Sequence, residues 1–504
     1  MPKQTLPKGY SDSNVLGRRL HKQPEEVWLK KGEKNALALF RQMAKRVPAY
    51  KDFLKNNNFS PQSVKSFTDF SKIPTIDKDN YLRKYPLEML CWDGKFDANS
   101  WVISTTSGST GEPYYFPRES LQDQQYAVVA EQYLRNNFDI ENKSTLYVVA
   151  FPMGAWIGGV FTYEALKIVA KNKKYNLSII TPGINKQGVI DAIKRLGKSF
   201  DQIIIGAYAP FLKDILDDGE RQGIKWSDLN VGFVFSAEAF SEAFRDYVLR
   251  VAQPKDILRN TLNHYGTVDL GTMAHETPES ILTRRELVKE NKLNILFPEA
   301  GRQPTFCQYN PELFYFEQVD NNLLCSAFSG LPLVRYDLKD YGGVMSRKDA
   351  LSKLDLAGIN IKKLASAAKI DKISQNLPYV YIYERNDFSV SYYAFLIYPE
   401  MVRKALQSKD LEKRLTGKFT MLVDYDKAGR QRLHINSEMK FGVADVDLEN
   451  EVVEIVHRKL QHDSSEYNET FKMVGDIAKP LIHLWEYENP VYFKPGTKQK
   501  WVIK

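Results

Sequence analysis

The sequence has little cysteine and no closely spaced cysteine pair. Three cysteines, Cys91, Cys307 and Cys325, occur in 504 residues. An odd number of widely separated cysteines argues against a disulfide framework and against a cysteine-based zinc cluster. The sequence therefore predicts a protein of a reducing compartment.

The sequence also lacks an apolar leader and an uninterrupted membrane-spanning run. The first residues, MPKQTLPKGYSDSN, contain no signal-peptide core. One uncharged run, residues 146–163, approaches membrane-spanning length, but Pro152, Gly154, Gly158 and Gly159 interrupt it. We interpret this run as a buried strand, a glycine-rich loop and the beginning of a helix. We therefore expect no membrane span and a cytoplasmic location.

No block of one charge sign dominates the chain. The formal net charge is +8, and the basic residues are interspersed with acidic ones. Such a distribution does not indicate a nucleic-acid footprint, and we expect no nucleic-acid partner. The alternative hypothesis is that the basic tail, residues 491–504, binds nucleic acid. A modest positive charge suits small anionic ligands such as nucleotides or CoA.

The chain is expected to be an α/β protein with a second, smaller domain. Nearly all-apolar strands alternate with helix-like segments from residue 101 onward, which predicts a mostly parallel sheet covered on both faces. The predicted strands are residues 145–151, 177–181, 202–207 and 231–236, and the predicted helices are near 160–170, 187–196, 210–217 and 241–251. Ligands in such sheets bind beyond the carboxyl ends of the strands.

Other periodicities flank this region. Residues 33–47 carry a one-sided apolar stripe, and short strands after residue 285 predict a small antiparallel sheet or barrel with a hairpin at 313–328. A second hairpin at 418–436, a helix at 447–460 and a strand at 481–487 predict a smaller α+β domain. The predicted domains are a helical lead-in (1–100), a core (101–385) and a C-terminal domain (386–504).

The stretch 104–118, STTSGSTGEPYYFPR, is the first candidate site. Its small residues can offer backbone N–H groups and hydroxyls to an anion, although it lacks the GxxxxGK[ST] spacing of a Walker loop. The candidate phosphate ligands are Thr106, Ser107, Gly108, Ser109, Thr110 and Gly111. The alternative interpretation is an ordinary surface loop.

Seven segments together resemble the ATP-dependent adenylate-forming enzymes, most of all the phenylacetate–CoA ligase and CapK branch. Each match alone is weak evidence. The resemblance rests on the fact that all seven segments occur in the same order along the chain as in the family. The segments are FSKIPTIDKDNY (70–81), TTSGSTGEP (105–113), SAEAF (236–240), HYGTVD (264–269), LVRYDLKD (333–340), YERNDFSV (383–390) and KPGTKQKW (494–501).

The resemblance implies a nucleotide site, makes the C-terminal domain (386–504) a lid over that site, and gives individual residues roles. ATP and Mg²⁺ are the implied cofactors, with Asp269 as the metal-binding acid and Glu238 as a second metal candidate. Tyr265 would stack on adenine, Asp340 would hold the ribose hydroxyls, and Lys498 would stabilise developing charge. Further implied nucleotide contacts are Ser236, Ala237, His264, Gly266, Thr267 and Arg385. Each of these residues could also serve an ordinary structural purpose, such as capping a helix, packing in the core or lying on a solvated face.

The acid substrate is expected next to the loops after two strands. The candidate pocket residues are Phe151, Trp156, Gly158, Ala207 and Tyr208. They favour an aromatic or apolar small-molecule acid, although plain core packing explains them equally well. The neighbouring pair His275–Glu276 lacks the partner spacing of a metal site.

The implied reaction is activation of a carboxylic acid as acyl-AMP, followed by transfer to a thiol of CoA or of carrier-protein phosphopantetheine. Transfer to an amine, forming an amide, is the alternative within the enzyme class. A catalytically degenerate nucleotide-binding homologue is the alternative outside it. Glu112 motivates that alternative, because the family commonly has a lysine there. An acyl-carrier protein is a candidate partner, and the oligomeric state is left open, with a dimer as one option.

Overall fold

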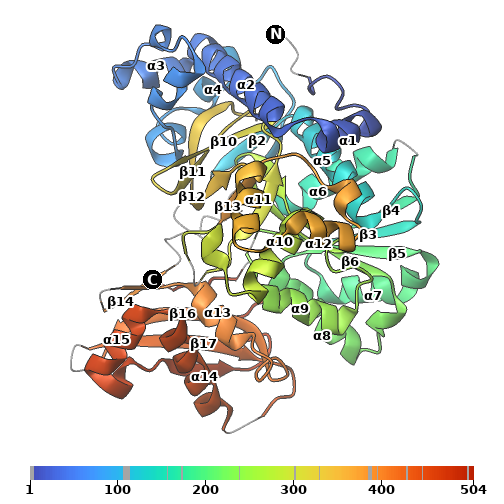
Figure 1. Ribbon diagram of the computed structural model, residues 1–504, viewed down its shortest axis with the longest axis vertical. Coiled ribbons are helices and arrows are strands. Elements are labelled where there is room, and N and C mark those ends of the chain that lie inside the picture. Colours follow the sequence, from blue (N-terminus) through green and yellow to red (C-terminus); the bar gives the residue numbers. More distant parts are fainter. Residues whose placement is uncertain are drawn as a thin grey trace.

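The structure is a computed structural model (Figure 1). It describes residues 5–503 apart from 106–113, 156, 172–173, 238, 300–301, 329, 384–388, 394, 427–429, 445–446 and 497–498. A large N-terminal part forms most of the molecule, and a smaller C-terminal module packs against one end of it. The boundary predicted near residue 385 lies outside the described residues.

One sheet of eleven strands runs through the N-terminal part. In spatial order its strands are β10 (Phe314–Val319), β11 (Asn322–Ala327), β12 (Leu333–Met345), β13 (Tyr379–Ile382), β9 (Thr305–Tyr309), β8 (Gly271–His275), β7 (Thr261–Thr267), β6 (Val231–Ser236), β5 (Gln202–Ala207), β3 (Thr145–Ala150) and β4 (Leu177–Ile180). Neighbours from β7 to β4 are parallel, and the pairs from β10 to β7 are antiparallel. The structure thus confirms the predicted α/β class and all four predicted parallel strands.

Helices cover both faces of the parallel half because its strands are apolar on both sides. One face packs against α5 (Ser120–Phe138) and α6 (Ile157–Lys171). The opposite face packs against α7 (Lys186–Leu196), α8 (Ala209–Arg221) and α9 (Glu242–Ala252). The uncharged run 146–163 therefore forms a buried strand and the first turns of α6, as predicted. No helix among the described residues is both long and apolar enough to cross a membrane.

The predicted antiparallel sheet is continuous with the parallel one. Strand β12 joins them, since its first half pairs with β11 and its last residues pair with β13. The predicted hairpin is present as β10 and β11, which pair from Phe314↔Ala327 to Val319↔Asn322. Helices α10 (Pro278–Lys289), α11 (Arg347–Leu356) and α12 (Ile361–Ala367) pack on this half of the molecule.

Most of the N-terminal helical region packs on the antiparallel strands, whereas its first helix lies beside α5 (Figure 1). Its helices are α1 (Ser13–Lys22), α2 (Glu25–Arg46), α3 (Pro48–Asn56) and α4 (Leu87–Leu90). The predicted apolar stripe lies on α2, with Phe40 and Met43 fully buried, although the helix begins earlier than the stripe. A small hairpin of β1 (Val102–Thr105) and β2 (Tyr115–Arg118) follows these helices.

The C-terminal module is a three-stranded sheet with helices on one face. Its elements are β14 (Val390–Tyr392), β15 (Phe395–Ile397), α13 (Pro399–Leu406), β16 (Leu415–Tyr425), β17 (Gln431–Met439), α14 (Leu448–Asp463), α15 (Ser465–Val474) and β18 (Leu481–Trp485). β16 and β17 form the predicted hairpin, and β18 adds in parallel to β17. The apolar side of α14, including Val452 and Val456, covers the sheet.

Ion pairs connect the module to the N-terminal part. Lys418 of β16 lies 2.5 Å from Asp214 of α8, and both side chains are buried. Lys440 lies 2.9 Å from Asp217, one turn further along α8. Arg302 lies 2.7 Å from Glu400 of α13. In each of these pairs, one charged residue belongs to the module and its oppositely charged partner to the N-terminal part.

Candidate active site

The carboxyl ends of four parallel strands meet at one edge of the sheet. Ala150 of β3 is level with Ala207 of β5, and Ser236 of β6 is level with His264 of β7. Several predicted residues therefore lie along one edge, because they are in or directly after these strands: Phe151, Ala207, Tyr208, Ser236, Ala237, His264, Tyr265, Gly266 and Thr267. Ala237, just after β6, has a left-handed backbone with φ of 69°. An alanine rarely adopts this conformation, and such strain concentrates at functional sites.

The β1–β2 hairpin brings Thr105, which directly precedes the candidate phosphate loop, to the same edge. Thr105, the last residue before the loop, donates its backbone N–H to the Ala155 carbonyl at 2.9 Å, and Ala155 follows β3. Arg118, which follows the loop, donates to Asp123 at 2.8 Å and to Ser104 Oγ at 3.2 Å. The loop residues Thr106 to Gly111, and Glu112, lie outside the described residues. The beginning of the loop is thus fixed next to the segment after β3, and the strand that follows the loop is tied to β1 and α5.

Tyr265 and Asp340 meet although they are far apart in the sequence. The Tyr265 hydroxyl donates to Asp340 Oδ2 at 2.6 Å. Burial and the nearby Asp340 carboxylate raise the pKa of Tyr265 well above its usual range, so the phenol stays protonated. The Tyr265 ring is 8% exposed and packs against Phe316. The two residues predicted to hold adenine and ribose are therefore joined by a short hydrogen bond.

Asp269 is a buried carboxylate with two partners. The Tyr336 hydroxyl donates to Asp269 Oδ2 at 2.6 Å, and Lys78 Nζ lies 3.2 Å from the same oxygen. Both contacts use Oδ2, which leaves Oδ1 able to ligate a cation. No group of three or more metal-ligating side chains occurs among the described residues. A single carboxylate suits Mg²⁺ that takes its other ligands from phosphate oxygens and water.

Lys78 is a candidate site residue that sequence reasoning missed. It follows Asp77, which caps a short helical turn by accepting hydrogen bonds from the N–H groups of Asp79 and Asn80. Lys78 Nζ lies 5.7 Å from the centroid of Phe116 on β2, next to the base of the phosphate loop. The segment FSKIPTIDKDNY was singled out from the sequence, but nothing local in it connects this lysine with Asp269.

His264 lies on the face of the sheet that α5 and α6 cover. Its ring packs against Tyr133 at 4.8 Å between centroids and lies near His275 at 6.4 Å. Burial, with His275 nearby, lowers the pKa of His264 well below its usual range, so the imidazole is neutral. Gly266 and Thr267 follow on the same strand, and Thr267 Oγ1 accepts the Leu270 N–H at 3.2 Å.

The candidate acid pocket is walled by aromatic rings. The rings of Phe151 and Tyr208 lie 5.6 Å apart. Gly158 lies between them, since a Cβ placed on it would be 3.5 Å from Phe151 Cβ and 3.6 Å from the Tyr208 hydroxyl. Ala207, the residue before Tyr208, is buried on the face of the sheet that α7, α8 and α9 cover. Trp156 and Glu238 lie outside the described residues.

The end of the chain reaches this pocket from the C-terminal module. Gly496 has φ of 69°, and a Cβ on it would lie 2.5 Å from Ile184 Cβ, so glycine is required at this approach. Gly496 and Gln499 line a small cavity together with Tyr208. Lys498, between them, and Arg385 lie outside the described residues and stay predictions.

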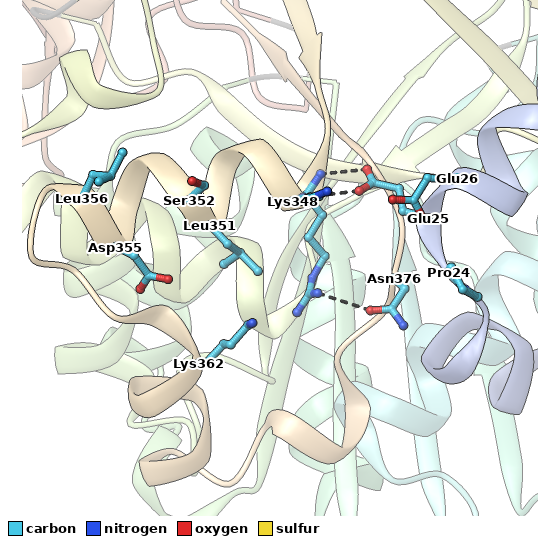
Figure 2. Close-up of a pocket in the computed structure, with 11 residues that line it drawn as sticks. Pro24, Glu25, Glu26, Lys348, Leu351, Ser352, Asp355, Leu356, Lys362 and Asn376 are labelled. Atoms are coloured by element: carbon cyan, nitrogen blue, oxygen red, sulfur yellow. Dashed lines mark hydrogen bonds between the residues drawn. The ribbon is translucent and has the colours of Figure 1, made fainter.

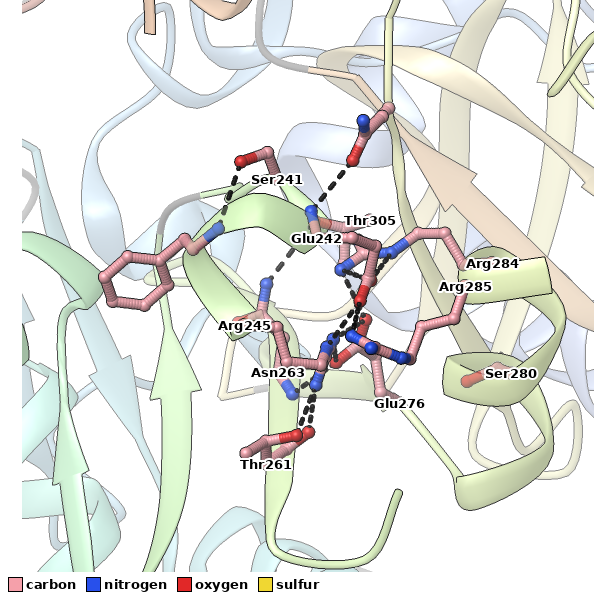
Figure 3. Close-up of polar contacts among 12 residues, drawn as sticks. Ser241, Glu242, Arg245, Thr261, Asn263, Glu276, Ser280, Arg284, Arg285 and Thr305 are labelled. Carbon is pink, nitrogen blue, oxygen red and sulfur yellow. Dashed lines mark hydrogen bonds and ion pairs between the residues drawn. The ribbon is translucent and has the colours of Figure 1, made fainter. Parts of the chain in front are cut away.

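A buried charge network braces β7 (Figure 3). Arg245 lies 3.0 Å from Glu242 and 2.8 Å from Glu276, and Arg284 joins Glu242 at 2.5 Å. Glu276 also accepts the backbone N–H of Asn263 at 2.9 Å. Glu276 is therefore an ion-pair partner of arginines. It fixes the strand that carries His264 and Tyr265.

A larger cavity of 610 Å³ lies elsewhere, between the beginning of α2 and α11 (Figure 2). Glu25 there accepts the N–H groups of Arg347 and Lys348, and the Arg347 guanidinium is paired with Glu279 at 2.6 Å. None of the predicted site residues lines this cavity. The position of the predicted residues therefore favours the sheet edge as the active site.

Solved structures of one enzyme share this architecture over almost the whole chain. 2-Hydroxyisobutyryl-CoA ligase in the postadenylation state with R3-HIB-AMP matches with a TM-score of 0.67 at 13% identity, over 96% of this chain and 91% of that one. This chain has the fold of the adenylate-forming ligases. The same enzyme with 2-HIB-AMP and CoA in the thioesterification state matches with a TM-score of 0.53 and equal coverage. The sequence matches no family model and no curated protein.

Within the adenylate-forming ligase fold, the predicted residues thus divide into three groups. The first group is Tyr265, Asp340 and Asp269. Asp340 accepts a hydrogen bond from the Tyr265 hydroxyl, and Asp269 is bound by the Tyr336 hydroxyl and by Lys78. Phe151 and Tyr208 form the aromatic wall. Gly158, in α6, lies between these two rings. The remaining described residues lie in or directly after the strands. They are Ala207, Ser236, Ala237, His264, Gly266 and Thr267.

Proposed function

We propose that the protein uses ATP to activate a carboxylic acid as an acyl-adenylate. The observation that carries this proposal is the meeting of Asp269, the Tyr265–Asp340 pair and the base of the 106–113 loop at one sheet edge. The adenylate-forming ligase fold supports it. A carboxylate oxygen of the acid would bond to the α-phosphorus while the bond to pyrophosphate breaks, and the electron pair leaves with pyrophosphate.

The chain's own residues would hold the two anionic reactants and offset charge. Asp340, oriented by Tyr265, is proposed to accept hydrogen bonds from the ribose hydroxyls. The backbone N–H groups and hydroxyls of residues 106–111 would donate to the β- and γ-phosphates. Lys78 adds a cation near that loop, and Lys498 and Arg385 are further proposed contacts. Asp269, with Glu238 as the second candidate, would hold Mg²⁺, which would neutralise phosphate charge when bound.

We further propose that the acyl group passes to a thiol of CoA or of a carrier-protein arm. The thiolate sulfur would bond to the acyl carbon, and the bond from that carbon to the phosphate oxygen would break, releasing AMP. An amine acceptor is the second candidate, because the same acyl-adenylate reacts with either nucleophile. Mass analysis of the product formed with CoA, carrier protein or amino acids separates these outcomes.

The proposal is tested by exchange of labelled pyrophosphate into ATP across a broad panel of acids. We expect exchange that requires an acid. Asp340→Ala should lower kcat/KM for ATP by about 100-fold or more, because two charge-assisted hydrogen bonds to a diol are lost. Asp269→Ala should also abolish exchange. Asp337→Ala on the same strand, whose carboxylate pairs with Lys339, is the matched control.

Absence of exchange with every acid, from protein that melts cooperatively, would contradict adenylation. ATP-dependent thermal stabilisation without AMP release would then favour the degenerate nucleotide-binding homologue. Glu112 motivates that second candidate, since it places an anion in the loop proposed to hold phosphate. A gain of exchange in Glu112→Lys would identify the loop as the weakened part.

A further inference from the structure

We propose that Arg335 is a positioning residue for the nucleotide site. It holds the segment 71–78 against β12, so that Lys78 reaches the Asp269 carboxylate. The inference rests on the proposed function, because Lys78 and Asp269 are residues that would bind ATP and Mg²⁺. It gives a role to the arginine of the segment LVRYDLKD, in which Tyr336 and Asp340 already contact the site.

The backbone of β12 is irregular at Arg335. Its φ is 49°, in the left-handed region that residues other than glycine rarely adopt. β12 carries one more residue than β11 at this point, between the pairs Ala327↔Leu333 and Cys325↔Tyr336. Such a β-bulge changes the face of the sheet toward which the following side chain points. The bulge thus brings Tyr336 to the face on which its hydroxyl donates to Asp269.

The guanidinium of Arg335 binds the chain segment that leads to Lys78. Its Nη1 donates to the Ser71 carbonyl at 2.6 Å and also to the Ile73 carbonyl. Its Nε lies 3.2 Å from both carboxylate oxygens of Glu317. The side chain is buried, so these contacts are shielded from water. The planar fork of arginine can serve both carbonyls and the carboxylate at once, whereas the single ammonium of a lysine cannot.

The segment continues along β12 until it reaches the site. The Ile76 N–H donates to the Arg335 carbonyl at 3.2 Å, and the Ile76 carbonyl accepts the Asp337 N–H at 2.8 Å. Two residues later, Lys78 Nζ lies 3.2 Å from Asp269 Oδ2. The contacts of Arg335 are therefore the first of a series along one segment that ends at the site carboxylate.

A purely structural role for Arg335 makes a different prediction. A structural arginine changes the free energy of unfolding but leaves the nucleotide affinity of the folded protein unchanged. A positioning arginine changes that affinity, and only while Lys78 is present to be positioned. The two roles are therefore separated by the coupling between Arg335 and Lys78.

The test is a double-mutant cycle on ATP affinity, measured as Kd for ATP with Mg²⁺ by calorimetry and as KM in pyrophosphate exchange. Arg335→Lys keeps a charge beside Glu317 but gives up part of the carbonyl contacts. We expect it to raise Kd and KM for ATP by about fivefold, with KM for the acid unchanged. In the Lys78→Met background the same substitution should change Kd by less than about twofold.

Arg347→Lys is the matched control. Arg347 is also largely buried and donates two hydrogen bonds to Glu279, at 2.7 and 2.6 Å, beside the larger cavity. Its substitution should lower the melting temperature and leave Kd for ATP unchanged.

Glu317→Gln replaces Arg335→Lys in the cycle if that variant does not fold. The amide keeps the shape of the carboxylate and removes the charge that orients the guanidinium. We expect Kd for ATP to rise by about threefold, and again only when Lys78 is present.

Two results overturn the inference while leaving adenylation intact. One is a Kd for ATP in Arg335→Lys that changes no more than in Arg347→Lys. The other is an equal change with and without Lys78. Absence of exchange from wild type that still binds ATP would overturn the proposed function alone, because the cycle on Kd still decides the role of Arg335. Absence of ATP binding would overturn both.

Discussion

At the scale of single residues, the site is defined by how its charges are paired. Asp269 is buried, yet Lys78 and Tyr336 both reach its Oδ2 atom. A buried carboxylate without such partners would be strongly destabilising. Lys78 therefore stabilises the folded site, and it also brings a positive charge close to a loop in which Glu112 supplies a negative one.

This arrangement predicts that Lys78→Met weakens ATP binding. We expect KM for ATP in the exchange assay to rise by about tenfold, the size of one charge-assisted hydrogen bond. Lys72→Met is the control, because Lys72 is exposed and pairs with Asp69 on the surface. Equal KM values for the two variants would show that Lys78 has no part in holding ATP.

The residue scale is also where the sequence was least informative. Asp269 and Asp340 could be singled out because motif spacing marks them. The hydroxyl bond between Tyr265 and Asp340 and the approach of Lys78 could not be foreseen, since each joins segments far apart in the chain. The role of His264 at the nucleotide stays a prediction; the structure adds that its ring packs against Tyr133 of α5.

At the scale of elements, the buried network of Figure 3 holds β7 in place. Glu242 is surrounded by Arg245, Arg284 and Arg285. Burial alone would raise its pKa, but these arginines outweigh burial and lower the pKa of Glu242 to about 2. The network thus depends on a carboxylate that stays charged well into acid.

A pH dependence of stability follows from this lowered pKa. A carboxylate with a folded-state pKa of about 2 and an ordinary value of 4.5 stabilises the fold above pH 4.5. Its contribution of about 3 kcal/mol is lost as the pH falls from 4.5 toward 2. Urea unfolding of wild type across this range should show the loss.

Glu242→Gln should remove most of this acid-dependent loss. At neutral pH it should lower the free energy of unfolding by about 3–5 kcal/mol, because the arginines lose a buried partner. Glu449→Gln, at an exposed position of α14, is the control. Identical acid profiles for wild type and Glu242→Gln would contradict the assigned role.

Individual strands and hairpins were the part of the fold that could be predicted best from the sequence. Apolar strands 145–151, 202–207 and 231–236 and the two hairpins could be located because their patterning is local. The joining of both strand sets into one sheet through β12 could not, because it depends on pairing with β13, which lies beyond two intervening helices.

At the scale of the whole molecule, the C-terminal module is docked beside the acid pocket. Its buried contact with α8 includes Lys418 and Asp214.

The central claim is that a carboxylate oxygen of the acid attacks the α-phosphorus of ATP. The most direct measurement uses an acid whose carboxylate carries ¹⁸O, chosen as the best substrate in the exchange assay, with the acyl acceptor present. We predict that AMP emerges with one labelled oxygen, since that oxygen becomes part of the phosphate when the acyl group leaves. Unlabelled AMP, or label in inorganic phosphate released with ADP, would contradict the account.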